Sequence, residues 1–400
     1  MRPVVPSPVT TGYRVQTKLV VRATRHGPLL GLYHPGTHRV VDTSRCPLHD
    51  PAIRHALPII RDALAAEGMP IHGAAGPGIR YLLVRASVSE RRLLVTLVSS
   101  HVPLPGIERL TRRLRERIKL AGLLVNENTS TGNVITGERT HRVWGEEVLR
   151  ERYGRLVLAA GPVAFVQANT RVAALIYARI AAAAALRGNE RVLDLYCGIG
   201  GIALTLAAAA GTVVGVEEID AAVRAARDNA SRHRISNARF ESGRVEETLT
   251  RIAPGGVEVV TMNPPRRGCG EAVARVLLTL GAPRIFYVSC SPESFARDAA
   301  TLIAGGYHLE RVEPFDLMPH TDHVELLGAF VRRDTLTRTH SGAEPGLLPR
   351  SRQRVSTESR QVLTTASTMA WPSLVPGILS TRIICAISRA ESSQLVWNWG

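Results

Sequence analysis

Cysteine and long apolar runs are both scarce in this 400-residue chain. Its five cysteines are widely spaced and form no CxxC pair, which argues against a disulfide framework or a zinc site. No apolar run approaches the roughly 20 residues that a membrane span needs, and the first residues lack the pattern of a signal segment. We therefore expect a cytoplasmic protein with no membrane association.

Acidic residues are also in short supply. The chain has 50 Lys and Arg against 34 Asp and Glu, a net charge of +16, and Lys18 and Lys119 are its only lysines. Phosphate neutralisation dominates nucleic-acid affinity, and the arginine fork suits phosphates and bases, so this balance favours a polyanionic partner. The codon bias of a GC-rich genome gives the same arginine excess, so charge alone does not name the partner.

The first part of the chain, residues 1–150, mixes two kinds of pattern. Strand-like runs occur at 17–21 and 92–98, and helical patterns occur near 51–66 and 106–120. This mixture is typical of a small α+β domain.

A regular alternation of strands and helices follows in residues 151–333. An Ala-rich helix near 170–186 leads into five strand–helix units, the pattern of a doubly wound α/β sheet. Two more strand-like runs, 307–319 and 323–333, are joined by a turn too short for a helix, so they must pair antiparallel. We expect a Rossmann-like, mostly parallel sheet with an antiparallel last strand.

The end of the chain, residues 334–400, changes character. It is rich in Ser, Thr and Arg, carries scattered Trp and has no sustained hydrophobic period. This composition predicts a disordered or accessory tail.

A glycine-rich turn joins the first strand of the regular part to its helix. Residues 194–201 read DLYCGIGG, and Glu217 ends the next strand. Glycines let a backbone approach a ligand closely, and an acidic residue about 20 positions further on accepts hydrogen bonds from ribose hydroxyls. The pattern favours a nucleotide-like ligand, although the motif is not a full GxGxxG and also fits a simple tight turn.

Two more motifs follow strands at the same predicted edge. Asn263 opens NPPRRG, in which two prolines fix the backbone so that carbonyls and the Asn amide face the site. Cys290 lies in SCSP, just before a helix whose N-terminal amides favour a thiolate. A rigid turn and an inert buried cysteine are the alternatives, but the carboxyl ends of the strands are where open α/β folds bind ligands.

A third motif, PHTDHVE at 319–325, precedes the reversed last strand. Because that strand runs backwards, its beginning shares an edge with the ends of the others. His320 and His323 have no matching ligands, so no metal site is expected. Five side chains are expected to converge on one rim: Asp194, Glu217, Asn263, Cys290 and Glu325.

Cys290 and Glu325 suit methyl transfer to carbon 5 of a uracil. That carbon is too weak a nucleophile to attack a sulfonium methyl unaided, and thiolate addition at carbon 6 activates the ring. A base must then remove the carbon 5 proton so that the thiolate leaves. The two residues would supply the nucleophile and the base.

On these motifs the chain resembles the RNA (uracil-C5)-methyltransferase family, and within it the 23S rRNA enzymes of the RlmC type. DLYCGIGG, NPPRRG, YVSCSP and PHTDHVE carry the resemblance, which runs from about Gly12 to Arg332. Asn263 is typical of that branch, since other branches have Asp before the two prolines. The resemblance implies a class I methyltransferase fold that forms 5-methyluridine in RNA, with residues before 150 gripping the RNA.

The resemblance also implies roles for individual residues and a cofactor. Cys290 would be the nucleophile and Glu325 the general base, and S-adenosyl-L-methionine would be the methyl donor. Contacts to that cofactor are expected from Gln167, Tyr196, Glu217 and Asn263, to which the glycine-rich turn adds Gly198 and Gly201.

The chain departs from that branch near its start. Members of the branch bind a four-iron cluster through three N-terminal cysteines and one in a CPL-like segment. Cys46-Pro47-Leu48 matches the fourth ligand, and no cysteine precedes it. An iron–sulfur cluster is therefore not expected, either through loss of the ligands or through a misassigned start. The small N-terminal RNA-binding barrel of other branches is not expected either.

Two other functions are weighed against this one. A methyltransferase of another base would not need Cys290, and amino methyltransferases carry an aromatic residue where this chain has Arg266. A non-catalytic RNA-binding or ribosome-assembly relative would fit the missing cluster ligands and the foreign tail, and would transfer no methyl group. A monomer that acts on 23S rRNA is the expectation.

Overall fold

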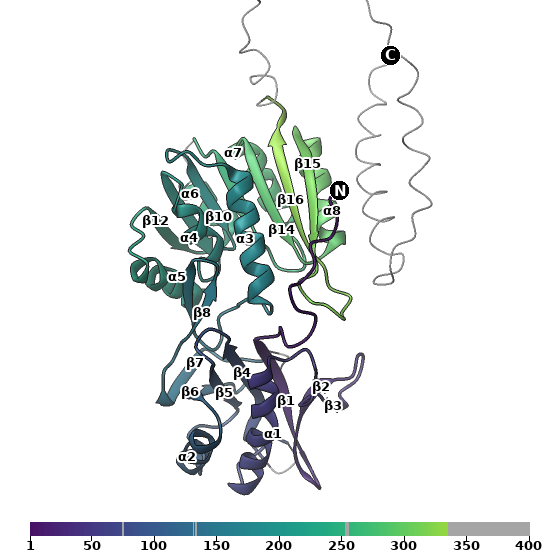
Figure 1. Ribbon diagram of the computed structural model, residues 1–400, viewed down its shortest axis with the longest axis vertical. Coiled ribbons are helices and arrows are strands. Elements are labelled where there is room, and N and C mark those ends of the chain that lie inside the picture. The colour runs from purple at the N-terminus through teal and green to yellow at the C-terminus, as the bar shows by residue number, and fades with distance from the viewer. Residues whose placement is uncertain (74–75, 131, 133, 253–255, 335–400) are drawn as a thin grey trace, which may run out of the picture.

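The computed structural model describes residues 1–73, 76–130, 132, 134–252 and 256–334. These residues form two seven-stranded sheets, one below the other, with a two-stranded hairpin near their junction (Figure 1). The predicted tail at 335–400 lies outside the described residues, and the division of the chain at 150 and 333 stays a prediction. No helix in the described ranges is long and apolar enough to cross a membrane.

The first sheet is mostly antiparallel and is covered on one face by two helices. Strands β5 and β6 are its parallel pair, because helix α2 provides the crossover between them. The predicted α+β character is confirmed. In spatial order the strands are β3 (Val40–Asp42), β2 (Gly27–Tyr33), β1 (Gln16–Thr24), β4 (Ile79–Ser87), β5 (Arg92–Ser99), β6 (Leu120–Glu127) and β7 (Arg139–Gly145), and the helices are α1 (Pro51–Ala66) and α2 (Ile107–Arg117).

Helix α1 shows how the sequence sets these elements. Asp50 caps it by accepting a hydrogen bond of 2.8 Å from the Ala52 amide, and Pro51 occupies its first turn, where no amide donor is needed. A buried stripe at helical spacing faces the sheet and forms the core of this part of the chain. Its members include Ile53, Leu57, Ile60 and Leu64.

The second sheet is mostly parallel, as predicted. Its last strand, β16, runs antiparallel to both neighbours and inserts between β14 and β15, so β15 forms the edge. The order is β12 (Ala238–Ser242), β11 (Thr212–Glu217), β10 (Arg191–Leu195), β13 (Val259–Met262), β14 (Arg284–Ser289), β16 (Glu325–Arg332) and β15 (Tyr307–Phe315).

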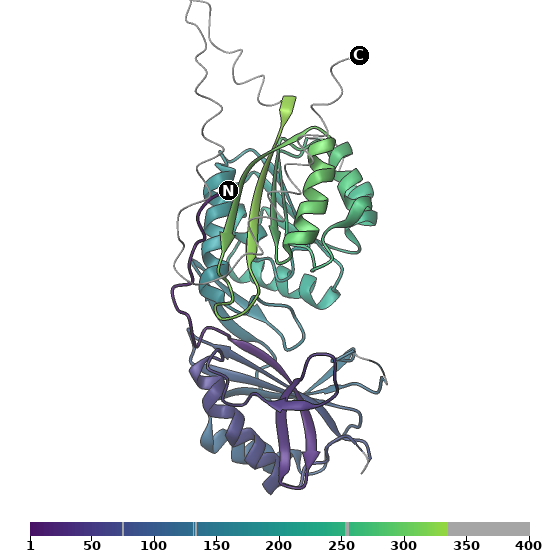
Figure 2. The same ribbon diagram turned by 90° about the vertical axis from the view of Figure 1, so that its right-hand side faces the viewer.

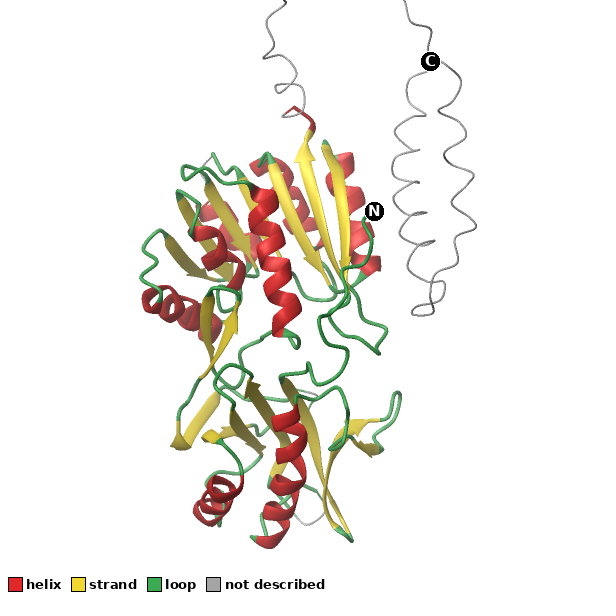
Figure 3. Ribbon diagram, in the orientation of Figure 1, coloured by secondary structure: helices red, strands yellow, loops and turns green. Residues whose placement is uncertain are grey.

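Helices cover both faces of this sheet (Figure 3). Two separate apolar cores result, one on each face, as expected for a doubly wound fold. One face carries α3 (Thr170–Ala184), α4 (Gly201–Ala207) and α5 (Asp220–Arg232), and the other carries α6 (Val245–Ile252), α7 (Gly270–Leu280) and α8 (Pro292–Ala304).

Two pieces of the fold have no counterpart in the sequence patterns. The hairpin of β8 (Leu149–Tyr153) and β9 (Leu156–Ala160) packs with α3, α4 and α5. The first residues of the chain run beside β15 (Figure 2). There the Val5 N–H donates to Pro314 O at 2.8 Å, and the Asp316 N–H donates to Val5 O at 2.9 Å. The N-terminus therefore extends the second sheet rather than the first.

Asn229 of α5 ties this hairpin to the glycine-rich turn, and its replacement gives a test of the fold. Its buried amide donates to Ala159 O and Ile199 O, both at 3.1 Å, and its oxygen accepts from Ala159 N at 2.8 Å. Asn229→Ala leaves these buried groups unpaired and should lower the free energy of unfolding by about 2–3 kcal/mol in urea denaturation. Asp228→Ala, an exposed neighbour, is the control, and an equal effect of both changes would contradict the assignment.

Candidate active site

The turn after β10 has a backbone shape that only glycine-rich sequence tolerates. Tyr196, Gly198 and Gly200 all have positive φ, at 59°, 53° and 89°. A Cβ built on Gly198 meets no heavy atom within 4 Å, so the backbone there faces open space. Gly201 starts α4 and packs against Tyr177, whose ring lies 2.7 Å from a Cβ position, so a side chain does not fit. The turn offers a bare backbone to a ligand on one side only.

Glu217 lies beside this turn at the end of β11. Its carboxylate accepts from the Gly198 amide at 3.0 Å and from the Ile219 amide at 2.9 Å. Each carboxylate oxygen keeps a free lone pair, so Glu217 still has acceptor capacity for a ligand hydroxyl.

Asp194 does not lie on the rim with the other predicted residues. It is 1% exposed, and its carboxylate accepts from Ala203 N at 2.9 Å and from the Thr261 hydroxyl at 2.7 Å. Burial raises the pKa of Asp194 to about 7. The expectation for this residue was wrong, because both of its oxygens bond inside the protein, where they brace the start of α4.

Three neighbouring strands end together at the rim. Leu195 is paired with Val216 on one side and with Met262 on the other, so the residues that follow are also neighbours. These residues are Tyr196, Glu217 and Asn263. The sequence prediction that they share one edge of the sheet agrees with this register.

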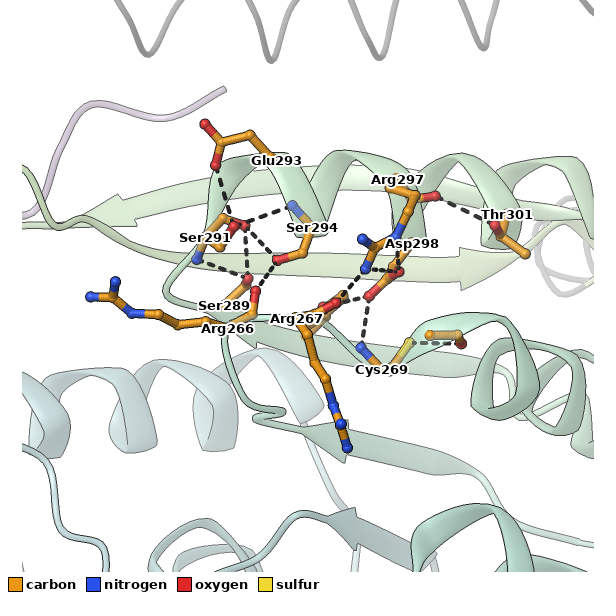
Figure 4. A network of polar contacts seen from close by, with 12 residues as sticks. Arg266, Arg267, Cys269, Ser289, Ser291, Glu293, Ser294, Arg297, Asp298 and Thr301 are labelled. Atoms are coloured by element: carbon orange, nitrogen blue, oxygen red, sulfur yellow. Dashed lines mark hydrogen bonds and ion pairs between the residues drawn. The ribbon is translucent and has the colours of Figure 1, made fainter. Parts of the chain in front are cut away.

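The loop after Asn263 is fastened to the first turns of α8 (Figure 4). Ser294 donates to Arg266 O at 2.9 Å, and the Asp298 carboxylate accepts from Cys269 N and from the Tyr287 hydroxyl, both at 2.8 Å. The side chains of Arg266 and Arg267 point away from this network (Figure 4). The network therefore fixes the backbone and leaves the two guanidinium groups outside it.

Cys290 and Glu325 meet through the register of β14 and β16. Val288 is paired with Leu327 and Ser289 with Leu326, so the next position places Cys290 opposite Glu325. Cys290 is half-buried and Glu325 is only 4% exposed. Burial raises the pKa of Glu325 to about 8, and burial together with the Glu325 carboxylate raises the pKa of the Cys290 thiol. The Cys290 thiol and the Glu325 carboxyl, both of which can ionise, therefore lie side by side where little water reaches them.

Arg266 is the cation beside this pair. Its guanidinium offsets part of the rise that burial causes in the pKa of Cys290 and of Glu325. The same guanidinium lies 3.0 Å from the ring nitrogens of His323. From the sequence, Arg266 was only a reason to exclude amino methylation, and its position beside Cys290 and Glu325 was not predicted. Its place in NPPRRG, one step from the two prolines, was the available signal.

The loop that carries Gln167 is held by the first sheet. Gln167 is 9% exposed. Nearby, the Val15 amide donates to Ala168 O at 2.9 Å, and the buried Arg85 donates to Gly161 O at 2.6 Å and to Ala164 O at 2.7 Å. Arg85 has no carboxylate partner among the described residues, and its two terminal nitrogens donate to carbonyl oxygens alone.

The loop before Glu325 is held by the same sheet. The Tyr13 hydroxyl, on a side chain that is 4% exposed, donates to Pro319 O at 2.8 Å. Asn169 joins the two loops, because its amide donates to Leu317 O at 3.1 Å. Both loops that flank the rim thus depend on contacts with the beginning of the chain.

The described residues do not provide the ligands of a metal cluster. They contain no group of three or more His, Cys, Asp and Glu side chains that would hold a metal ion. Cys46 is a free, half-buried thiol in the segment that resembles a cluster ligand. Absence of an iron–sulfur cluster from this protein stays a prediction.

Comparison with known proteins places the chain among RNA-modifying enzymes. Residues 146–334 match the tRNA (uracil-5-)-methyltransferase family. An RNA methyltransferase of Geobacter sulfurreducens is 36% identical over 360 residues, which is 89% of this chain and 72% of the relative. A second, from Thermosynechococcus vestitus, is 35% identical over 329 residues, covering 81% and 73%.

A solved structure matches most of the fold. It is the tRNA (uracil-54, C5)-methyltransferase of Pyrococcus abyssi in complex with S-adenosyl-L-homocysteine. The match has a TM-score of 0.69 and 27% sequence identity, and it covers 82% of this chain and 78% of that one.

Burial of Glu325 predicts a pH-dependent cost to stability. Its pKa rises from 4.5 to about 8 on folding, so in that window the folded chain binds more protons than the unfolded chain, and stability falls as the pH rises. Glu325→Gln has no such titration, so its free energy of unfolding should exceed that of the wild type increasingly from about pH 5 to about pH 8.

Urea denaturation at several pH values measures this difference, in which the titration of groups that Glu325 does not influence cancels. Exposed Glu271→Gln on α7 is the matched control and should track the wild type. A constant difference between Glu325→Gln and wild type across this range would refute the burial argument.

Proposed function

Because the chain belongs to the RNA (uracil-5-)-methyltransferase family, we propose that it forms 5-methyluridine through a covalent bond between Cys290 and the target base. The predicted enzyme class and the predicted cofactor, S-adenosyl-L-methionine, are confirmed. The observation that carries the mechanism is the β14–β16 register, which sets Cys290 opposite Glu325 with Arg266 beside both.

The cofactor site fits the rim around the glycine-rich turn. Gly198 presents bare backbone to open space, and Glu217 retains acceptor capacity for the ribose hydroxyls. When bound there, S-adenosyl-L-methionine supplies an electrophilic methyl group. The remaining contacts that we assign to it are Gln167, Tyr196, Gly201 and Asn263.

Cys290 acts first in the proposed mechanism. Its thiolate forms a bond to carbon 6 of the uracil, and the electrons of the 5,6 double bond move toward the carbonyl oxygen at carbon 4 as an enolate. Burial disfavours the thiolate, and the Arg266 guanidinium offsets part of that effect by lowering the pKa of Cys290. Arg266 is therefore a positioning residue that makes the nucleophile available.

Glu325 acts after methyl transfer. Carbon 5 of the enolate takes the methyl group, and the Glu325 carboxylate then accepts the proton from carbon 5. The electrons of the broken C–H bond restore the 5,6 double bond and expel the Cys290 thiolate. A carboxyl whose pKa is raised to about 8 is a stronger base than an ordinary one, which suits this step.

The two competing functions fit the site less well. Methylation of an amino group needs no thiol, yet Cys290 lies opposite a buried carboxylate at the ligand-binding edge of the sheet. A non-catalytic RNA-binding protein needs neither residue, and the burial of Glu325 lowers stability as the pH rises from about 5 to about 8.

The RNA that we propose as substrate is 23S rRNA, with the target uridine in an unpaired loop. Asn263 before the two prolines is the feature that favours the ribosomal branch. The solved relative acts on tRNA uracil 54, so tRNA is the second candidate. The thiol must reach the face of the base at carbon 6, which a stacked and paired uridine does not expose.

Separate substitutions should stop the reaction at different steps. Cys290→Ala should abolish methylation and adduct formation while S-adenosyl-L-methionine still binds, because the thiol acts on the base. Glu325→Gln should still add and methylate but fail to release, so a methylated protein–RNA adduct should accumulate on denaturing gels.

Wild-type enzyme provides the control for this experiment. RNA that carries 5-fluorouridine should trap it in the same way, since fluorine does not leave carbon 5 as a proton does. Cys269→Ala, at another free cysteine, should still form the adduct. Full turnover by Cys290→Ala, or an active wild type that gives no adduct with fluorinated RNA, would exclude the covalent mechanism.

A gene-deletion strain identifies the substrate. Mass-spectrometric mapping should show one 5-methyluridine lost from 23S rRNA and restored by the wild-type gene but not by the Cys290→Ala gene. Loss from tRNA with intact rRNA would assign the enzyme to the second candidate.

A further inference from the structure

A hairpin at the edge of the first sheet projects from the rest of the protein and has no role in the mechanism above. We call residues 22–45 the β2–β3 arm: they comprise the end of β1, strands β2 and β3, and the turns that join and follow them. Within β2, Leu30 and Gly31 are buried, whereas Leu32 and Tyr33 are exposed. The outer half of the arm is therefore solvated on both faces.

Apolar and aromatic side chains lie on this outer half. Leu32 is 42% exposed and Val41, its cross-strand partner, is 41% exposed. Tyr33 is 39% exposed, and the His38 ring meets it edge-on at 5.6 Å. Three of the ten large exposed apolar side chains in the described part of the chain thus lie on one short hairpin.

Positive charge accompanies these apolar groups. The arm contains four arginines and three histidines but a single acid, Asp42. None of the four arginines forms an ion pair with a described residue, although the Arg22 guanidinium donates to the Tyr33 hydroxyl at 3.3 Å. The arginines are Arg22, Arg25, Arg39 and Arg45.

The arm lies on the side of the molecule where the loop before Glu325 emerges (Figures 1 and 2). Its base is connected to that loop in two steps. The Gly12 amide donates to Pro47 O at 2.9 Å, and the Tyr13 hydroxyl donates to Pro319 O at 2.8 Å. An RNA strand bound in the active site would continue toward the arm.

We propose that the β2–β3 arm binds the unpaired RNA strand next to the target uridine. Tyr33 would stack on a base, and Arg25 and Arg39 would contact phosphates. Exposed aromatic rings beside unpaired arginines are the combination that binds single strands without reading their sequence. The inference rests on the proposed function, since it adds a second contact region for the same RNA.

Crosslinking and binding test the arm with oligouridine of about 20 nucleotides, which is long enough to extend beyond the active site. With 4-thiouridine in that RNA, ultraviolet light should crosslink the tryptic peptide of residues 26–39, which contains Tyr33. In fluorescence anisotropy, Tyr33→Ala should weaken binding about ten-fold without changing the salt dependence, whereas Tyr33→Phe should bind like the wild type.

The arginines should respond differently from the tyrosine. Arg25→Ala with Arg39→Ala should weaken binding and reduce the slope of log Kd against log salt by about 1.4, because two phosphate contacts are lost. A double change of exposed arginines on α5, Arg224→Ala with Arg232→Ala, is the matched control and should leave both quantities unchanged. An equal loss in that control, or crosslinks confined to other peptides, would overturn the assignment.

Methylation measured on the same preparations separates this inference from the proposed function. If the wild type is active and the Tyr33→Ala variant binds oligouridine normally, RNA binding by the β2–β3 arm is refuted and the enzyme assignment stands. If the wild type transfers no methyl group and the arm variants lose affinity for oligouridine, the enzyme assignment is refuted and RNA binding by the β2–β3 arm is supported.

Discussion

The antiparallel register between β14 and β16 is the constraint on which the proposed chemistry depends. It brings Cys290 from the end of one strand and Glu325 from the start of the other to opposite positions, across 35 residues of sequence. A shift of one residue would turn every side chain of β16 to the other face and remove Glu325 from the thiol. Burial of Leu326 and Phe330 on one face, and of Leu327 and Ala329 on the other, opposes such a shift.

A second constraint lies outside that sheet. The loops that carry Gln167 and lead to Glu325 are irregular, and their carbonyls are bonded by Arg85 and Tyr13 of the first part of the chain. Burial lowers the pKa of Arg85 to about 10, but it has three oxygen acceptors and stays charged at neutral pH. The first part of the chain thus sets the shape of the rim.

Sequence reasoning went furthest where local patterns decide the structure. Periodicity predicted a helix near 51–66, where α1 lies, and strand–helix alternation predicted the parallel sheet and its reversed last strand. It missed the pairing of Val5 with β15, because the few residues around Val5 that pair are too short a segment to show a hydrophobic period. Asp194 was misplaced because its position in the motif does not reveal that Ala203 and Thr261 occupy its carboxylate.

The charges of the site suggest an order for the proposed mechanism. Arg266 is one cation beside two acids, and water is largely excluded from Glu325, so both acids would not be ionised together at low cost. The thiolate carries the negative charge first and passes it to the uracil enolate when the bond to carbon 6 forms. Transfer of a methyl group from a cationic donor then neutralises the enolate. Arg266 then has no other anion to balance, so Glu325 releases its proton to solvent at that point, and the resulting carboxylate is the base that accepts the proton from carbon 5.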